Sequence, residues 1–261
     1  MSQGHKKKRP ADAMTSDNHD NGAKKKRLKS LSHALSWALR HEAPNLGLTM
    51  TKDGYVSVQD VLHCPHDKFT NRQRQQQKES GKHVLIRVPK FTTEDIHEVV
   101  ESNDKQRFKL EFKPSNVVGR TRGEPILCIR ANQGHSIPGL DLSMTPISVD
   151  TLPMVVHGTN YEAFQHIQET KGLKRMTRQH IHFARGLPHD EEVISGMRKS
   201  CTVYLFVDRE KCAKDSDRVT FYESDNGVIL TEGLDHSGIL PLEYISHVTD
   251  RHGKILLENR K

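Results

Sequence analysis

The apolar positions near the start of the chain follow the spacing of an amphipathic helix. They recur at intervals of three and four residues from Leu31 onward and stop before Pro44. Positions with this spacing share one helix face, and a proline ends a helix. We therefore expect a helix here, with Arg40 and His41 in its last turn. The apolar face would consist of Leu31, Ala34, Leu35, Ala38 and Leu39.

The pattern of the next segments predicts short helices followed by a β-hairpin. Asp53-Gly54 is typical of a tight turn before a strand at 55–58 and a short helix. Thr92 or Thr93 can cap a helix with one apolar face, after which residues 108–112 alternate as in a strand. We expect a winged-helix-like lobe over residues 30–145.

One stretch interrupts that lobe. Residues from about 65 to 90 include the polar, low-complexity run Gln73–Lys78. Runs of this composition lack the apolar positions that a packed core needs. We predict that the stretch is an inserted loop.

The second half of the chain changes to short strands separated by turn signals. One helix is expected at Tyr161–Glu169, and residues 143–152, with Pro146, are expected to be a linker. Short strands of this kind predict a compact β-rich lobe, here over residues 153–255. The fold class is therefore α+β. The predicted strands are 154–156, 181–184, 203–207, 219–222 and 228–230.

The charge of the chain is concentrated at its start. The formal net charge is +7, but residues 1–30 alone hold nine Lys/Arg against three Asp/Glu. An anion site in the rest must therefore be a local cluster. Residues 1–29 contain the basic clusters Lys6–Arg9 and Lys24–Arg27 and are expected to form a disordered tail. Nuclear import, weak RNA affinity and solubility are all open as its role.

Composition also indicates the compartment. No apolar run approaches the length that crosses a bilayer, and the Lys-rich N-terminus does not resemble a secretory signal. The cysteines form no CxxC pair, which favours reduced thiols. We expect a monomeric, soluble, intracellular protein in the cytoplasm or the nucleus. The cysteines are Cys64, Cys128, Cys201 and Cys212.

A polar cluster follows the apolar segment that begins at Ile126. Arg130 ends the segment, and Gly134 and Ser136 follow in a run of polar residues. An arginine beside the backbone amides of a glycine turn is an arrangement that holds phosphate. The alternative is an ordinary polar loop after a buried strand.

Two further positions can bear chemistry. Arg40 lies nearly opposite the centre of the apolar helix face, so that it is free to contact a ligand, although a cation at a helix C-terminus is also stabilised by the helix dipole. His157 precedes Gly158, where the backbone can approach a cofactor closely. The alternative for His157 is a structural histidine.

Other site classes are disfavoured. His180 and His182 share one strand face, but two histidines without a third ligand are a weak indication of a metal, and we expect none. The motifs GxSxG, HExxH and the P-loop are absent, as is a G-x-G-x-x-G that follows a strand. Their absence disfavours hydrolases, zinc peptidases, dinucleotide-binding dehydrogenases and kinases.

Taken together and in order, five blocks resemble the RNA 2'-phosphotransferase (KptA) family from about Leu31 to Tyr244. The resemblance implies an N-terminal winged-helix RNA lobe and a C-terminal NAD lobe of the ADP-ribosyltransferase kind. The basic tail and the Gln-rich stretch depart from the family without touching a motif. The blocks are Leu31–His41, Arg130–Ser136, His157–Thr159, His180–His182 and Asn226–Thr231.

The resemblance also implies a reaction. An internal 2'-phosphate, left on tRNA by splicing, attacks C1'' of the nicotinamide ribose of NAD and expels nicotinamide. The ribose O2'' of the ADP-ribosylated RNA then attacks the phosphorus, which gives a 2'-OH and ADP-ribose 1'',2''-cyclic phosphate. The reaction needs neither a metal nor a protein nucleophile.

The family motifs assign roles to residues of this chain. Arg178 would act on the NAD side and support the second step. The implied contacts to the RNA phosphate are Arg40, His41, Arg130 and, more weakly, Ser136. The implied contacts to NAD are His157, Gly158, Thr159 and, more weakly, His182 and Asn226.

Two other functions remain open from the sequence. The same NAD lobe can transfer ADP-ribose to terminal phosphates of nucleic acid or to protein, which would leave a stable ADP-ribosylated polymer. A non-enzymatic RNA-binding module would bind RNA without consuming NAD.

Overall fold

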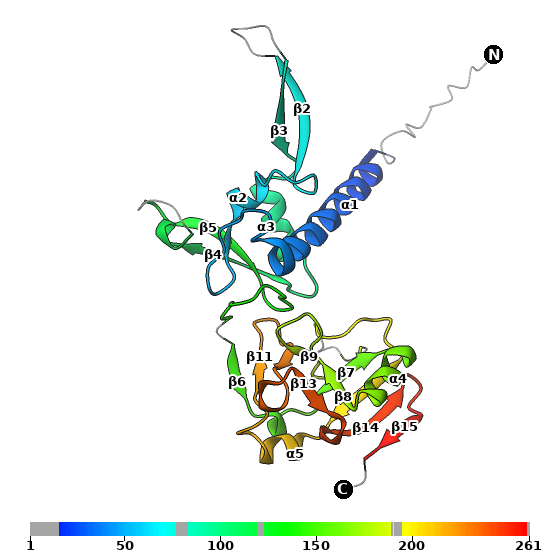
Figure 1. Ribbon diagram of the computed structural model, residues 1–261. Coiled ribbons are helices and arrows are strands. Elements are labelled where there is room, and N and C mark those ends of the chain that lie inside the picture. The colour runs from blue at the N-terminus through cyan, green and yellow to red at the C-terminus, as the bar shows by residue number, and fades with distance from the viewer. Residues whose placement is uncertain are drawn as a thin grey trace, which may run out of the picture.

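The computed structural model describes residues 16–76, 83–118, 123–142, 144–188, 190 and 195–259. The chain forms two lobes, each with its own buried apolar cluster (Figure 1). Helices and sheets are both present and are mostly segregated along the chain, so that the predicted α+β class is confirmed. Among the described helices, none is both long and apolar enough to span a membrane.

The N-terminal lobe packs three helices against a three-stranded antiparallel sheet. The strand order is β1-β5-β4, and β4 and β5 pair along their whole length, with Phe108 opposite Ala131. A π-helical turn, η1, follows α1 directly. The elements are α1 (Ser16–Trp37), η1 (Ala38–Glu42), β1 (Val56–Ser57), α2 (Val58–Leu62), β2 (Thr70–Gln76), β3 (His83–Pro89), α3 (Thr93–Glu101), β4 (Phe108–Lys113), η2 (Ser115–Val118) and β5 (Ile126–Ala131).

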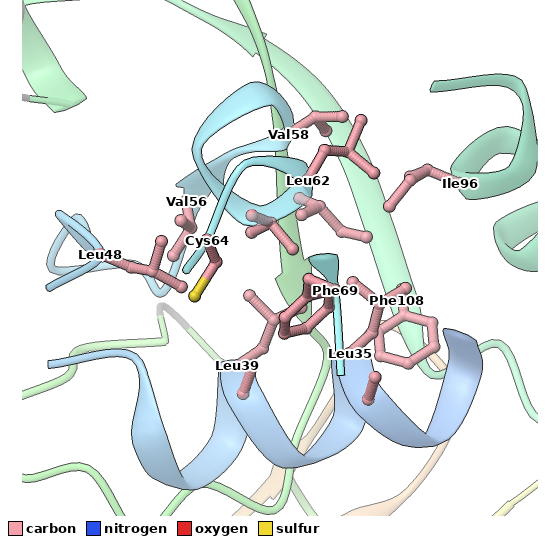
Figure 2. Close-up of a cluster of buried hydrophobic side chains, with 14 of the residues drawn as sticks. Leu35, Leu39, Leu48, Val56, Val58, Leu62, Cys64, Phe69, Ile96 and Phe108 are labelled. Carbon is pink, nitrogen blue, oxygen red and sulfur yellow. The ribbon is translucent and has the colours of Figure 1, made fainter. Parts of the chain in front are cut away.

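The predicted apolar face of the first helix forms the centre of this lobe. Leu31, Leu35 and Leu39 are fully buried, and Figure 2 shows Leu35 and Leu39 beside Phe69 and Phe108. Burial of one such side chain contributes about 2 kcal/mol. Helix α3 begins as predicted, because the Thr92 side chain accepts from Asp95 N and the Asp95 carboxylate accepts from Thr92 N.

The first helix begins earlier than its apolar pattern predicts. Residues 16–29, expected in a disordered tail, lie within α1, while Lys6–Arg9 falls outside the described residues. The extension has little amphipathic character, but Lys24 pairs with Glu98 at 2.8 Å and Arg27 with Asp95 of α3. Leu28 also packs against the lobe's core. These contacts to α3, with good helix formers in between, explain why the helix continues.

The predicted inserted loop is largely a β-hairpin instead. Strands β2 and β3 pair in register from Thr70–Pro89 to Gln76–His83 and project from the lobe (Figure 1). The Gln-rich composition concealed the strand, because nearly every side chain of β2 is exposed and the apolar residues lie on β3. Lys78, at the end of the Gln-rich run, lies outside the described residues.

The C-terminal lobe encloses its core with two four-stranded antiparallel sheets and a small strand pair. The strand orders are β15-β14-β10-β7, β6-β11-β12-β9 and β13-β8. A bridge between Val156 and Ala184 links the two larger sheets. The elements are β6 (Thr145–Ile147), η3 (Val149–Thr151), β7 (Val156–Thr159), α4 (Tyr161–Glu169), β8 (Gly172–Lys174), β9 (Ile181–Phe183), β10 (Val203–Val207), α5 (Arg209–Lys214), β11 (Phe221–Glu223), β12 (Ile229–Thr231), η4 (Leu234–His236), β13 (Ile239–Pro241), η5 (Leu242–Tyr244), β14 (Ile245–Asp250) and β15 (Ile255–Glu258).

The predicted pattern of this lobe is confirmed in part. The predicted strand at 154–156 meets β7 only at Val156, and the pattern did not indicate α5, β8, β13, β14 or β15. The helix at Tyr161–Glu169 and the strand at Val203–Val207 have the predicted bounds. The segment expected to be a linker instead supplies β6, the edge strand beside β11, with Pro146 opposite Tyr222. A proline is tolerated there because an edge strand leaves one side of its backbone unpaired.

Candidate active site

The end of the first helix presents Arg40 to the space between the lobes. The chain changes from α-helical to π-helical winding at Ala38, so that Arg40 and His41 lie in a wider turn. Single π-turns inside helices are frequent at functional sites, because the extra residue turns side chains away from the regular helix face. Ser136 N donates to Arg40 O at 2.9 Å, which fixes this turn against the loop after β5.

That loop turns at Gly134, as the sequence predicts. Gly134 has φ +88°, in the region that favours glycine, and the Arg40 side chain packs on the side where a Cβ would lie, 3.5 Å away at Nε. Beyond it, the Ser136 hydroxyl lies 2.8 Å from Nδ1 of His41. Two blocks that are distant in the sequence thus meet at one position.

The C-terminal lobe supplies the opposite wall through β7 and β9. His157 Nδ1 lies 2.8 Å from the carbonyl oxygen of His182, and His182 Nε2 lies 3.0 Å from Oε1 of Gln133 in the N-terminal lobe. The second contact joins the lobes across the site. It also orients the His182 ring with Nε2 as the donor, because the amide oxygen of Gln133 accepts.

Gly158 lines the cleft and also has a packing role. A Cβ at this position would overlap Cγ of Met197 and lie 2.9 Å from Sγ of Cys201. The space beside its Cα is therefore filled by protein side chains. The glycine allows the Met197 loop to close on β7, and it positions this wall through packing.

These elements enclose a cleft of about 530 Å³. This volume falls in the range of sites for small molecules and cofactors. Both lobes contribute to it, and its cationic side chains come from four separate segments. The lining includes Arg40, Lys105, Arg107, Gln133, His157, Gly158, Thr159, Arg178, His182 and Arg198.

The cleft accumulates positive charge without neutralising it. Among the described residues, no carboxylate forms an ion pair with Arg40, Arg107 or Arg178. Burial, followed by the nearby Arg178 and Arg107, lowers the pKa of Arg40 to about 10. Burial and Arg198 likewise lower the pKa of Arg178. Uncompensated cations in a half-enclosed space attract an anion strongly.

The histidines of the site are held neutral. Burial, and then Arg178, lower the pKa of His182 to about 3, and burial also lowers the pKa of His157. His41 is exposed, but partial desolvation together with Arg40 and Arg178 lowers its pKa. An anion bound between these arginines would oppose that effect, because it favours the imidazolium form.

Arg130 lies in the seam between the lobes instead of the cleft lining. Its Nη2 donates to Oδ2 of Asp225 at 2.8 Å, its Nη1 donates to Asp53 O at 3.3 Å, and its guanidinium lies 5.1 Å from the Tyr55 ring centre. Lys109 pairs with the same Asp225 oxygen at 2.9 Å. The side chain that we predicted to clamp a phosphate is therefore buried and engaged by a carboxylate.

Asn226 also lies in the seam. Its Nδ2 donates to Lys105 O at 2.8 Å, and its Oδ1 accepts from the Ser224 hydroxyl. The side chain is buried. Its hydrogen bond to the backbone of Lys105 helps to position this cation of the cleft.

Sequence reasoning missed several residues of the cleft. Lys105 and Arg107 precede a strand without forming a motif, and Arg198 lies in an irregular segment. Gln133 stands inside the polar run after β5, but nothing in the sequence pattern assigned it a contact of its own.

His135, from the same run, is almost fully buried and has no partner for either ring nitrogen within the described part of the chain. Burial and the nearby cations Arg40 and Arg130 lower its pKa to about 3.

His180 and His182, which share one strand face, contact different groups. His180 contacts Glu232 and the Tyr222 ring, while His182 contacts Gln133. No described group of three or more His, Cys, Asp or Glu side chains could hold a metal ion. The fold and the cleft together define a two-lobed α+β protein whose charge is suited to a phosphorylated ligand.

The chain belongs to the RNA 2'-phosphotransferase, Tpt1 / KptA family, which matches residues 26–233. It is 40% identical to the putative tRNA 2'-phosphotransferase of Schizosaccharomyces pombe over 87% of this chain, and it spans about half (53%) of that relative's length. It is 40% identical to tRNA 2'-phosphotransferase 1 of Danio rerio, with 83% of each chain covered. The tRNA 2'-phosphotransferase of Saccharomyces cerevisiae is 35% identical over 71% of this chain and 70% of its own. The resemblance seen in the motif blocks is confirmed.

Proposed function

We propose that this protein is an NAD-dependent tRNA 2'-phosphotransferase that removes the internal 2'-phosphate left at a splice junction. The observation that carries the proposal is the convergence of Arg40, Arg178 and the His157–Thr159 segment on one cleft. Relatives with up to 40% identity are named as tRNA 2'-phosphotransferases. The proposed lobes are a winged-helix-like RNA lobe and an ADP-ribosyltransferase-like NAD lobe.

The cleft fits the two substrates chemically. NAD carries a pyrophosphate and the RNA a 2'-phosphate, and the cleft offers several cations without carboxylate partners among the described residues. Bound NAD supplies an electrophilic ribose carbon with nicotinamide as the leaving group. In this proposal His157 and Thr159 hold the nicotinamide riboside; both line the cleft, and the packing at Gly158 fixes their strand. The histidines of the cleft are neutral, so that its positive charge comes from the arginines and the lysine, which can bind phosphate.

In the first step, an oxygen of the 2'-phosphate forms a bond to C1'' as the bond to nicotinamide breaks. Arg40 and His41 orient the phosphate toward that carbon, and orientation of this kind can supply several kcal/mol of the barrier. His41 is fixed by Ser136 at 2.8 Å. Arg130 joins the clamp when its guanidinium exchanges Asp225 for the phosphate.

In the second step, O2'' attacks the phosphorus and the bond to the RNA O2' breaks. A proton moves from O2'' to the departing RNA oxygen, and His41 is suited to carry it because an imidazole can accept and donate a proton near neutral pH. Arg178 stabilises the charge on the phosphoryl oxygens. The products are RNA with a 2'-OH and ADP-ribose 1'',2''-cyclic phosphate.

The test uses a short RNA with one internal 2'-phosphate, incubated with and without NAD. We expect NAD-dependent loss of the phosphate, release of nicotinamide and formation of the cyclic phosphate. Stable ADP-ribosylated RNA without the cyclic product would identify an ADP-ribosyltransferase. RNA binding without NAD consumption would identify a binding module.

A variant separates the two steps. Arg178→Ala should slow the second step more than the first, so that ADP-ribosylated RNA accumulates. Equal slowing of both steps would remove the special role of Arg178 in the second step.

A further inference from the structure

A second, larger groove lies against the cleft. Its volume is about 1070 Å³, and it runs between α1, the connection from α3 to β4, and the segment around Met197. Lys105, Arg107, Ser195 and Met197 line both the groove and the cleft. The groove therefore meets the cleft along a shared wall.

Helix α1 presents one row of side chains to this groove. Lys25, Lys29 and Ser32 are spaced three and four residues apart, so that they share one helix face. The helix is held in this orientation by the pairing of Arg27 with Asp95 and by Leu28 in the core. The tail residues expected to be disordered are thus a fixed wall of the groove.

The groove is positively charged. Lys25 and Lys29 are exposed on α1, and Lys199 faces the same space from the C-terminal lobe. Within the described residues none of these three lysines has a carboxylate partner, whereas Lys24 is paired with Glu98. Like charges four residues apart destabilise a helix slightly, and a bound polyanion would offset this.

The shared wall continues the charge into the cleft. Burial, followed by Arg107 and Lys199, lowers the pKa of Lys105, and Lys105 Nζ donates to Met197 O at 3.0 Å. Cations are therefore present from α1 to Arg40 along one continuous surface. Two carboxylates also line the groove, Glu98, which pairs with Lys24, and Asp104, so that the cations outnumber them. Much of the remaining lining is hydroxyl and amide groups, which suit a phosphate and sugar backbone more than an apolar peptide.

We propose that this groove binds the RNA strand next to the 2'-phosphorylated nucleotide, with Lys25, Lys29 and Lys199 on its backbone phosphates. This inference rests on the proposed function, since it concerns the same substrate. The contacts are to the backbone, so that they supply affinity without base specificity. The groove serves RNA that extends beyond the cleft and is not needed by the shortest substrates.

The experiment compares two substrates with the same central 2'-phosphate, a trinucleotide and a 20-nucleotide RNA. The variant is Lys25→Gln with Lys29→Gln. The matched control is Lys26→Gln, which removes an exposed charge from the same helical turn but does not line the groove. Circular dichroism melting verifies that each variant is folded.

We expect the double variant to raise KM for the long RNA roughly tenfold at low salt and to leave kcat unchanged. The trinucleotide should show no change, and Lys26→Gln should behave as wild type. The slope of log KM against log salt should fall by about 1.4, that is about 0.7 for each lost phosphate contact on a single strand. An unchanged KM for the long RNA, or equal effects on both substrates, would overturn the inference.

A binding measurement separates this inference from the proposed function. If the wild type removes the phosphate from neither substrate, the proposed function fails. Fluorescence anisotropy with an unphosphorylated 20-nucleotide RNA then tests whether the groove binds RNA. A weaker affinity and a shallower salt slope for the double variant alone would support it. Equal binding by wild type and both variants would refute it.

Discussion

The cleft and the seam between the lobes use arginine in opposite ways. In the cleft, Arg40 and Arg178 have no carboxylate partner among the described residues, and the pKa of each is lowered by burial and a neighbouring cation. In the seam, Arg130 and Lys109 share Asp225. Charge that holds the lobes together is neutralised, while charge that faces the cleft is left for a ligand.

A single sequence motif contains residues that face the cleft and residues that hold the lobes together. Arg130 lies within β5 near its end and belongs to the seam, while Gln133 in the turn that follows contacts His182 in the cleft. The two side chains reach different regions because β5 ends at Ala131 and the chain bends at Asn132 and Gln133. A family motif therefore does not assign one role to all of its members.

The largest expected effect comes from removing charge in the cleft. Arg40→Gln should lower kcat/KM for 2'-phosphorylated RNA by about 10²–10³-fold, the loss typical when a preorganised donor to a developing charge is removed. Steady-state release of nicotinamide measures it. Arg87→Gln, which removes an exposed pair with Asp67, is the control and should stay within about twofold. Similar losses in both variants would contradict the view that the unpaired charge of the cleft binds the substrate.

The seam should respond in stability. Asp225→Asn leaves the buried guanidinium of Arg130 without its carboxylate and should lower the free energy of unfolding by about 3 kcal/mol. Arg130→Gln should cost only about 1 kcal/mol, since Asp225 is 41% exposed and keeps its pair with Lys109. Urea unfolding gives both values. If Asp225→Asn also raises the affinity for RNA, Arg130 is released toward the phosphate, as proposed; a lower affinity would argue against that exchange.

The neutral histidines make stability dependent on pH. His182 and His135 have pKa values of about 3 when folded, against about 6.5 when unfolded. The unfolded chain therefore binds more protons below pH 6.5, and stability present above that pH is lost as the pH falls toward 3. From pH 7 to pH 5 each histidine should cost about 2 kcal/mol. In urea unfolding, His182→Gln should lose less unfolding free energy between pH 7 and pH 5 than the wild type. An unchanged pH dependence would contradict the lowered pKa of His182.

The smallest expected effect tests the packing of the cleft wall. Gly158→Ala places a methyl group against Met197 and Cys201, and overpacking of this kind costs about 1–2 kcal/mol. The Met197→Ala substitution in the same chain should relieve part of that cost. Thermal unfolding of the single and double variants measures it. Additive effects of the two substitutions would mean that they are not in contact.

Much of the local structure follows from the sequence because its causes are local. The helix over Tyr161–Glu169, the strand Val203–Val207 and the Thr92 cap depend on periodicity and capping within a few residues. The glycine turn at Gly134 follows in the same way. The order of the motif blocks was also sufficient to indicate the family.

The departures arise where distant segments meet. Pairing with α3 extends α1 through a polar tail, and pairing with β11 turns the expected linker into β6. The Gln-rich stretch becomes a hairpin because β3 supplies its apolar residues.

The sequence by itself determined the class of the fold, most element positions and the residue types that suit phosphate chemistry. Only the tertiary structure decided which of those residues face the cleft. Arg40 and Arg130 are both arginines in family motifs, but Asp225 neutralises one and no described carboxylate pairs with the other. The physical reason is that desolvation and Coulomb interactions depend on distances between segments that are far apart in the chain, and sequence spacing does not specify those distances.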